Sequence, residues 1–272
     1  MIKKGTLDIS WLGGLIPYRS IPVLVYHHVT ETEREDIRAF SISPGRFLSQ
    51  MRYLKKKGYA SISLDELANI EMGGESGAGP GPKIKSPKTK NLFAISFDDG
   101  YLDNYTNAFP VLKLFGFKAT VFLATGFVGK KTQPIGSCAP SAHMDWPQAK
   151  EMQRHGMSFQ SHTCTHPDMT KIGVEQINRE LNESRKEIED HLGAPVRHFA
   201  YPYGRFNERV MERVKEAGYA WSYAAGASER SSFARERFDV DTEDPPVLFR
   251  FMASGYGSWV RTVRNGFLRK RF

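Results

Sequence analysis

The stretch ISFDDGYLDN, residues 95–104, ends an apolar run with two adjacent aspartates and a glycine. Ile95 and Phe97 follow a strand pattern, which predicts a β-strand that stops at Asp98. An Asp-Asp-Gly sequence taken alone indicates a turn, because Asp and Gly tolerate the backbone angles that turns need. The alternative is a strand end where Gly100 lets the chain bend, so that both carboxylates reach one site. The rest of the chain decides between these two interpretations.

Strand and helix patterns alternate on both sides of this stretch. Amphipathic segments separate successive apolar runs, and the pattern amounts to about seven strand-then-helix units. Such alternation predicts an α/β fold with parallel strands, as an open doubly wound sheet or a closed barrel. The predicted strands lie near 21–29, 59–63, 91–97, 118–125, 157–162, 197–202 and 219–225, the last being the final strand. Residues 127–145 are predicted to form a long loop rich in Gly, Pro and Ser.

The clearest helix pattern covers residues 174–192 and ends at Gly193. Its apolar residues fall on one stripe, which predicts a helix packed against a core. The stripe contains Ile177, Leu181, Ile188 and Leu192.

The composition is that of a globular protein, with 272 residues, 40% hydrophobic and 25% charged. No apolar stretch approaches the roughly 20 residues that a membrane-spanning helix needs. Residues 1–19 lack a clear signal-peptide core, so we expect a retained N-terminal extension. This favours the cytoplasm or the cytoplasmic face of a membrane, with export as the alternative. Cys138 and Cys164 allow at most one disulfide.

The formal net charge of +8 suits an anionic partner in general. The positive charge is concentrated in residues 83–90 and 254–272, however, which gives little support to nucleic-acid binding. Residues 73–90 are predicted to form a mobile Gly/Pro/Lys-rich loop within a single domain, residues 20–253. The basic amphipathic tail, 254–272, is either a packed terminal helix or a peripheral contact with an anionic membrane.

Polar clusters follow four of the predicted strands. His27 and His28 end the first strand. Asp98 and Asp99 follow the strand near 91–97, and His162 ends the strand near 157–162. The turn Pro202-Tyr203-Gly204 ends another. Function gathers at the carboxyl ends of strands in α/β barrels and doubly wound sheets. Four such clusters favour a site over simple turn chemistry.

The segment SHTCTHPDM, residues 161–169, places His162 and His166 at H-x3-H spacing. Two imidazoles with Asp98 or Asp99 would leave coordination positions open, which suits a catalytic divalent metal. The H-E-x-x-H glutamate of zincins is missing. A non-haem iron oxygenase uses the same ligand types, and purely structural histidines are also an alternative. The second aspartate suits a general base, and a backbone N–H of the 201–204 turn suits an oxyanion donor.

Taken together, SFDDGY, SHTCTHPDM and FAYPYG resemble the NodB-type polysaccharide deacetylases of carbohydrate esterase family 4. The resemblance covers roughly residues 20–225. It implies a distorted (β/α)7 barrel that removes N-acetyl groups from GlcNAc-type glycans, with one divalent metal, zinc first and cobalt, nickel or iron as alternatives. It makes Asp98 the base and the Tyr203 backbone N–H an oxyanion donor. The implied metal ligands are Asp99, His162 and His166.

The sequence departs from the general family pattern in three places. Ala200 and Tyr201 stand where many members carry an arginine that tethers the base, so Arg197 and Arg205 are candidates to orient Asp98. FAYPYG instead resembles the branch that acts on poly-β-1,6-GlcNAc. The family's fourth motif has no clear match in ERFDVDTEDPP, residues 236–246.

The third departure concerns the acid that protonates the leaving group. In the family a late histidine usually has this role, but no histidine follows His198 in this sequence. The resemblance aligns His27 with an early strand-end histidine that takes this place, and His28 is the fallback. Cys164 is expected to be a packed or partly exposed thiol and not a ligand. Two alternatives stay open: deacylation or deformylation of a lipid-linked sugar, and an inactive carbohydrate-binding protein. The oligomeric state is not predicted.

Overall fold

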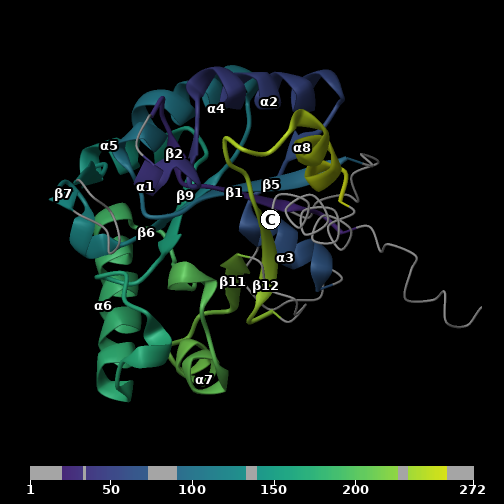
Figure 1. The fold of residues 1–272 in the computed structure, drawn as a ribbon. Helices are drawn as coiled ribbons and strands as arrows, with labels where there is room; N and C mark the ends of the chain where they lie inside the picture. Colours follow the sequence, from purple (N-terminus) through teal and green to yellow (C-terminus); the bar gives the residue numbers. More distant parts are fainter. Residues whose placement is uncertain (1–19, 33–34, 73–90, 133–139, 226–231, 256–272) are drawn as a thin grey trace, which may run out of the picture.

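The computed structural model describes residues 20–32, 35–72, 91–132, 140–225 and 232–255 (Figure 1). The predicted extension 1–19, the loop 73–90 and nearly all of the tail 254–272 lie outside these residues, as does Cys138. The ends of the described chain meet, because the Ser20 N–H donates to the Gly255 carbonyl oxygen at 2.9 Å. No helix in the described ranges is long and apolar enough to span a bilayer.

Seven parallel strands close into a barrel within the described residues. Their order is β1-β12-β11-β10-β9-β6-β5, and β5 pairs again with β1. The short strand β4 (Ala60–Ser61) pairs with the start of β5 as an eighth strand. This closure selects the predicted (β/α)7 barrel over the open sheet. The barrel strands are β1 (Val23–Tyr26), β5 (Leu92–Phe97), β6 (Thr120–Leu123), β9 (Ser158–Ser161), β10 (His198–Ala200), β11 (Trp221–Ala225) and β12 (Arg235–Asp239).

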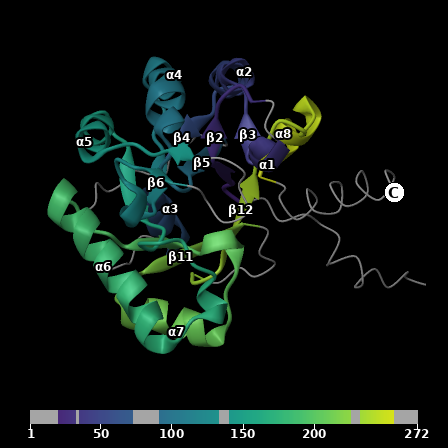
Figure 2. The ribbon, with the colours of Figure 1, turned by 60° about the vertical axis from the view of Figure 1, so that its left-hand side comes forward.

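Helices cover the outside of the barrel (Figures 1 and 2). Local signals define their ends: the Ser43 hydroxyl caps α2 by accepting from the Arg46 N–H, and Gly193 ends α6 with a φ of 63°. The helices are α1 (Glu35–Arg38), α2 (Pro44–Lys56), α3 (Leu64–Glu71), α4 (Phe109–Phe115), α5 (Trp146–Arg154), α6 (Val174–Leu192), α7 (Glu208–Glu216) and α8 (Pro246–Ala253), with a π-helical turn η2 (Asn104–Ala108) before α4.

The prediction that 219–225 is the last strand is wrong. The barrel closes through β12, which pairs with β11 on one side and with β1 on the other. The sequence of β12, RERFD, carries four charged residues and therefore lacks a strand-like apolar pattern. The predicted strand near 59–63 supplies β4 instead, beside the barrel wall.

Short extra strands occur where loops were expected. Within the predicted loop 127–145, β7 (Lys131–Thr132) and β8 (Ser141–Ala142) form an antiparallel pair. After β1, β2 (His28–Val29) pairs in parallel with β3 (Ser41–Ile42).

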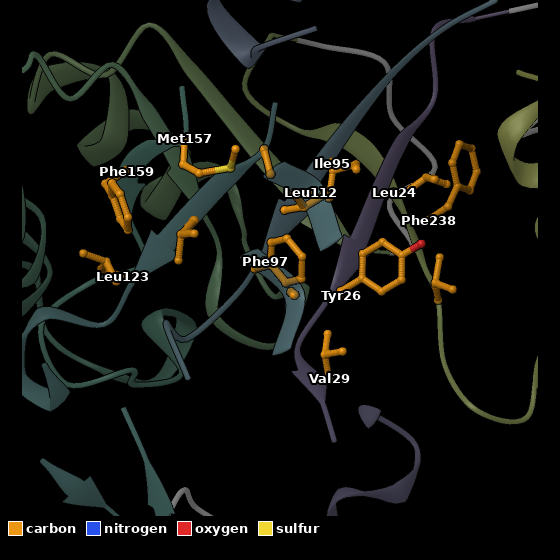
Figure 3. Packing of buried hydrophobic residues seen from close by; sticks show 14 of the residues in the cluster. Leu24, Tyr26, Val29, Ile95, Phe97, Leu112, Leu123, Met157, Phe159 and Phe238 are labelled. Atoms are coloured by element: carbon orange, nitrogen blue, oxygen red, sulfur yellow. The ribbon is translucent and has the colours of Figure 1, made fainter. Parts of the chain in front are cut away.

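The main hydrophobic core lies between the barrel wall and its helices (Figure 3). Phe97 stacks on Tyr26 from the neighbouring strand, with ring centroids 5.6 Å apart. Both side chains are fully buried, as is Leu112 from α4. Burial of this apolar surface stabilises the barrel.

Candidate metal and catalytic site

Parallel strands bring their carboxyl ends to one end of the barrel, and the predicted site residues meet there. Asp98 and Asp99 follow β5, and His162 follows β9. Asp99 has a φ of 68°, and Gly100 has a φ of 70°. The left-handed φ of Gly100 favours glycine at this bend, and a Cβ there would also displace the end of the Leu123 side chain. The Asp-Asp-Gly stretch is thus both a turn and part of a site.

Asp99, His162 and His166 form a cluster in which one ligand atom of each lies within 4.8 Å of the others. The Nε2 atoms of the two imidazoles are 3.1 Å apart. The Asp99 Oδ1 atom lies 3.3 Å from His166 Nε2 and 3.6 Å from His162 Nε2. Burial opposes ionisation of Asp99, but the two imidazoles outweigh it and hold the pKa of this carboxyl well below its usual range.

The donor set fits a divalent cation. His162 Nδ1 lies 2.8 Å from the Ala200 carbonyl oxygen, which can only accept, so Nδ1 carries the proton. Burial lowers the pKa of His162 to about 4, so the ring is neutral at pH 7. Its Nε2 lone pair therefore faces a carboxylate oxygen and a second imidazole nitrogen. Such convergent lone pairs are what a metal ion needs, and a backbone partner on Nδ1 is typical of ligand histidines.

Asp98 is buried beside this cluster and is held by Arg237 from β12. Arg237 Nη1 donates to Oδ1 at 2.6 Å, and Nη2 donates to Oδ2 at 2.7 Å. Burial raises the pKa of Asp98, but the Arg237 charge prevails and lowers it, so the carboxylate is ionised at neutral pH. The Arg237 guanidinium also lies over the Phe122 ring, 5.1 Å from its centroid.

The candidates proposed from the sequence to orient Asp98 are therefore wrong. Arg197 Nη1 lies 3.8 Å from Asp65, and Arg205 Nη1 lies 2.7 Å from Asp168. Arg237 lies within the segment 236–246, in which the family's fourth motif has no clear match. A signal existed, since a buried carboxylate needs a cation and the usual arginine is absent.

His27 and His28 have different surroundings. His27 is half-buried beside Phe40, with ring centroids 5.3 Å apart. Burial raises the pKa values of Asp98 and Asp99, and the His27 charge is one of the smaller contributions that lower them, after Arg237 at Asp98 and after His166 and His162 at Asp99. His28 is buried, and its Nδ1 lies 2.7 Å from Asp103 Oδ2. The structure thus pairs His28 with Asp103, whereas the charge of His27 acts on the two aspartates.

Tyr203 lies at the same end of the barrel. Its ring packs edge-on against the His166 ring, with centroids 4.6 Å apart, and 43% of the residue is exposed. Tyr203 and Gly204 have φ angles of 59° and 64°. A Cβ at Gly204 would lie 2.7 Å from the Ala225 carbonyl oxygen, so the turn depends on this glycine.

Cys164 stands between the two histidines in sequence, but its thiol points elsewhere. Its Sγ lies 3.7 Å from the Glu180 carbonyl oxygen on α6, and the residue is partly exposed. Burial raises the pKa of the thiol to about 11, so it is protonated at neutral pH. The metal-type cluster does not include it.

Comparison with known proteins identifies the family. Residues 85–222 match the family described as polysaccharide deacetylase. The chain belongs to this family. It is 30% identical over 266 residues to YxkH of Bacillus subtilis, whose name assigns it provisionally to the polysaccharide deacetylases; the match spans 96% of this chain and 83% of YxkH. The protein is accordingly a deacetylase and a hydrolase.

A second relative of this deacetylase has a named substrate. The chain is 27% identical over 199 residues to the poly-β-1,6-N-acetyl-D-glucosamine N-deacetylase of Staphylococcus aureus. The match covers 70% of this chain and 63% of that enzyme, so the chain spans less than two thirds of this relative.

Solved structures agree with the deacetylase fold. The Streptococcus pyogenes deacetylase PplD, in complex with acetate, superposes with a TM-score of 0.71 at 24% identity, over 88% of this chain and 99% of that one. IcaB from Ammonifex degensii gives 0.68 at 25% identity, over 88% and 97% of the two chains.

Proposed function

We propose that this deacetylase removes N-acetyl groups from a GlcNAc-type glycan, with poly-β-1,6-GlcNAc as the leading substrate class. The observation that carries the proposal is the convergence of Asp99, His162 and His166 beside the buried Asp98. The deacetylase family, and the substrate named for the Staphylococcus aureus relative, support the glycan.

The proposed metal is one divalent cation, zinc first, held by Asp99, His162 and His166. When bound, it would polarise the acyl oxygen and make a water acidic enough to attack at neutral pH. His162 is prepared for this role because the Ala200 carbonyl fixes its tautomer. With His166 and Asp99 it would supply three protein ligands, which would leave coordination positions open for water and substrate.

Asp98 is the proposed general base. Its ionised carboxylate can accept a proton from the attacking water, and the two hydrogen bonds from Arg237 fix its plane. The remaining lone pairs of its oxygens stay available, since a carboxylate has about four acceptor positions.

Two further groups complete the proposed mechanism. The Tyr203 backbone N–H would donate to the oxyanion that forms at the acyl carbon. The His27 imidazolium would protonate the amine as the carbon–nitrogen bond breaks, because an amine leaves poorly without a proton.

The test is acetate release from N-acetylglucosamine oligomers of β-1,6 and β-1,4 linkage. The protein is stripped with a chelator and then reconstituted with zinc, cobalt or nickel. We expect little release without metal, recovery on reconstitution, and a preference for the β-1,6 oligomers. Equal turnover with and without metal would overturn the metal-dependent mechanism, and turnover of neither oligomer would overturn the substrate class.

A further inference from the structure

Helix α6 carries a buried carboxylate that its apolar stripe does not explain. Glu180 lies on the face that also buries Ile177 and Leu181, and only 5% of it is exposed. Within the described residues, no Lys or Arg side chain forms an ion pair with it. Burial of an ionised carboxylate is costly without compensating donors, so the donors that it does meet reveal its role.

Within the described part of the chain, the donors to the Glu180 carboxylate all come from the segment between His162 and His166. Its Oε2 accepts from the Cys164 N–H at 2.7 Å and from the Thr165 N–H at 2.9 Å. Its Oε1 accepts from the Thr165 hydroxyl at 2.6 Å. One side chain of α6 therefore binds two successive backbone groups of the loop that joins the two imidazoles.

This loop needs an external restraint. Thr163 and His166 have φ angles of 70° and 55°, in the left-handed region that side chains with a Cβ disfavour. Inside the loop, the His166 N–H donates to the Thr163 hydroxyl at 2.9 Å. The two strained residues flank the pair of amides that Glu180 binds.

Backbone hydrogen bonds from Thr125 and Gly126 hold the opposite side of the loop. The Gly126 N–H donates to the Cys164 carbonyl at 2.9 Å, and the Thr125 N–H donates to the Thr163 carbonyl at 3.1 Å. A Cβ at Gly126 would lie only 2.7 Å from the Cys164 carbonyl oxygen, so this approach is as close as glycine permits. The loop is therefore held between the 125–126 turn and Glu180.

We propose that Glu180 is a positioning residue that holds the loop in the conformation in which both imidazoles meet one metal ion. The inference rests on the proposed metal site. Glu180 touches neither substrate nor metal in this role; it acts through the amides of Cys164 and Thr165. Loss of such an outer partner typically weakens metal affinity by about 10- to 100-fold.

The test compares Co²⁺ binding to the full-length apo-proteins of the wild type, Glu180→Gln and Thr165→Val. Competition with a chelator gives the affinity, the visible absorption of bound Co²⁺ reports ligand geometry, and thermal unfolding reports stability. Glu180→Gln removes the negative charge from the group that accepts both backbone N–H groups, which weakens these hydrogen bonds, so we expect up to about 10- to 100-fold weaker binding and an altered spectrum. Thr165→Val removes one donor, and a smaller loss in the same direction is expected.

Glu189→Ala is the matched control. Glu189 lies on the same helix and accepts from the Val196 N–H at 2.9 Å and from Arg185 Nε at 3.2 Å. Its removal should lower the unfolding temperature and leave Co²⁺ affinity and the spectrum unchanged.

The outcomes separate the two proposals. A wild type that binds no Co²⁺ would overturn the proposed metal site itself. A wild type that binds Co²⁺, beside folded Glu180→Gln and Thr165→Val proteins with the same affinity and spectrum, would overturn the positioning role of Glu180. Equal loss of affinity in Glu189→Ala would also overturn it, since the effect would then reflect stability alone.

Discussion

Arg237 and Asp98 form a two-point ion pair inside the barrel, with N–O distances of 2.6 and 2.7 Å. Both side chains are almost fully buried. A guanidinium can bind both carboxylate oxygens in one plane, whereas an ammonium cannot reproduce this geometry. The pair fixes the direction and the charge of the proposed base together.

The first prediction concerns this pair. In Arg237→Gln the pKa of Asp98 should rise, because burial then acts without the opposing cation. A base must be ionised, so activity should be lost at a higher pH than in the wild type, by about 1–3 pH units. The acid limb of kcat/KM against pH measures the shift. Arg197→Gln, which alters a half-exposed pair with Asp65, should leave the limb in place; an unmoved limb in Arg237→Gln would refute the assignment.

The second prediction separates the two aspartates. Asp99→Asn should lose most bound metal, because a neutral amide is a weaker ligand than a carboxylate. Asp98→Asn should keep its metal and lose about 10²–10⁴ in rate, the usual contribution of a general base. Metal content by elemental analysis and acetate release are measured on both proteins. Near-normal turnover in Asp98→Asn would exclude the base role.

The third prediction concerns the metal histidines. His162→Ala and His166→Ala should each lose metal and activity, because each removes one of only three protein ligands. Divalent metal is quantified after dialysis of each protein. Full metal content with full activity in both variants would mean that the site is misassigned.

The fourth prediction compares His27→Ala with His28→Ala. His27→Ala should keep its metal and lose most activity on an amide substrate, while an activated acetyl ester should suffer less because its leaving group needs little protonation. The ratio of the two rate losses is the measurement. Equal losses on both substrates would remove the acid role from His27, and a selective loss in His28→Ala would transfer it.

The fifth prediction uses a pair of glycines. Gly204→Ala and Gly58→Ala both force alanine into the left-handed region, at φ angles of 64° and 72°. Only Gly204 also meets a neighbour, the Ala225 carbonyl at 2.7 Å; nothing lies within 4 Å of the Cβ position at Gly58. Gly58→Ala should lower the free energy of unfolding by about 1 kcal/mol, and Gly204→Ala by more. Denaturant unfolding measures both, and equal losses would contradict the close approach.

The sequence predicted the metal-type cluster because strand ends are readable. Asp98 and Asp99 directly follow an apolar run, His162 directly follows the predicted strand that begins at Met157, and parallel strands bring their carboxyl ends together. His166 followed from its spacing to His162. The barrel itself followed from the alternation of strands and helices together with the family resemblance, since alternation alone also fitted an open sheet.

The sequence could not predict what pairs with Asp98. Arg237 occupies a strand of RERFD composition, where hydrophobic periodicity predicts no strand. Its burial depends on a contact with a residue more than a hundred positions away, which no local pattern encodes. The hydrogen bonds of the Glu180 carboxylate could not be predicted either, because a glutamate within a helix normally faces solvent.

Barrel closure has a consequence for biosynthesis. β1, which emerges first, pairs with β12 near the end of the described chain. When residues 20–225 have been synthesised, the chain contains all the motifs that were recognised in the sequence. Arg237, the partner of Asp98, has not yet been added. A chain that stops before residue 235 lacks β12, so the barrel is open and Asp98 has no Arg237 partner. Synthesis through β12 is therefore a condition for the assembly of the site.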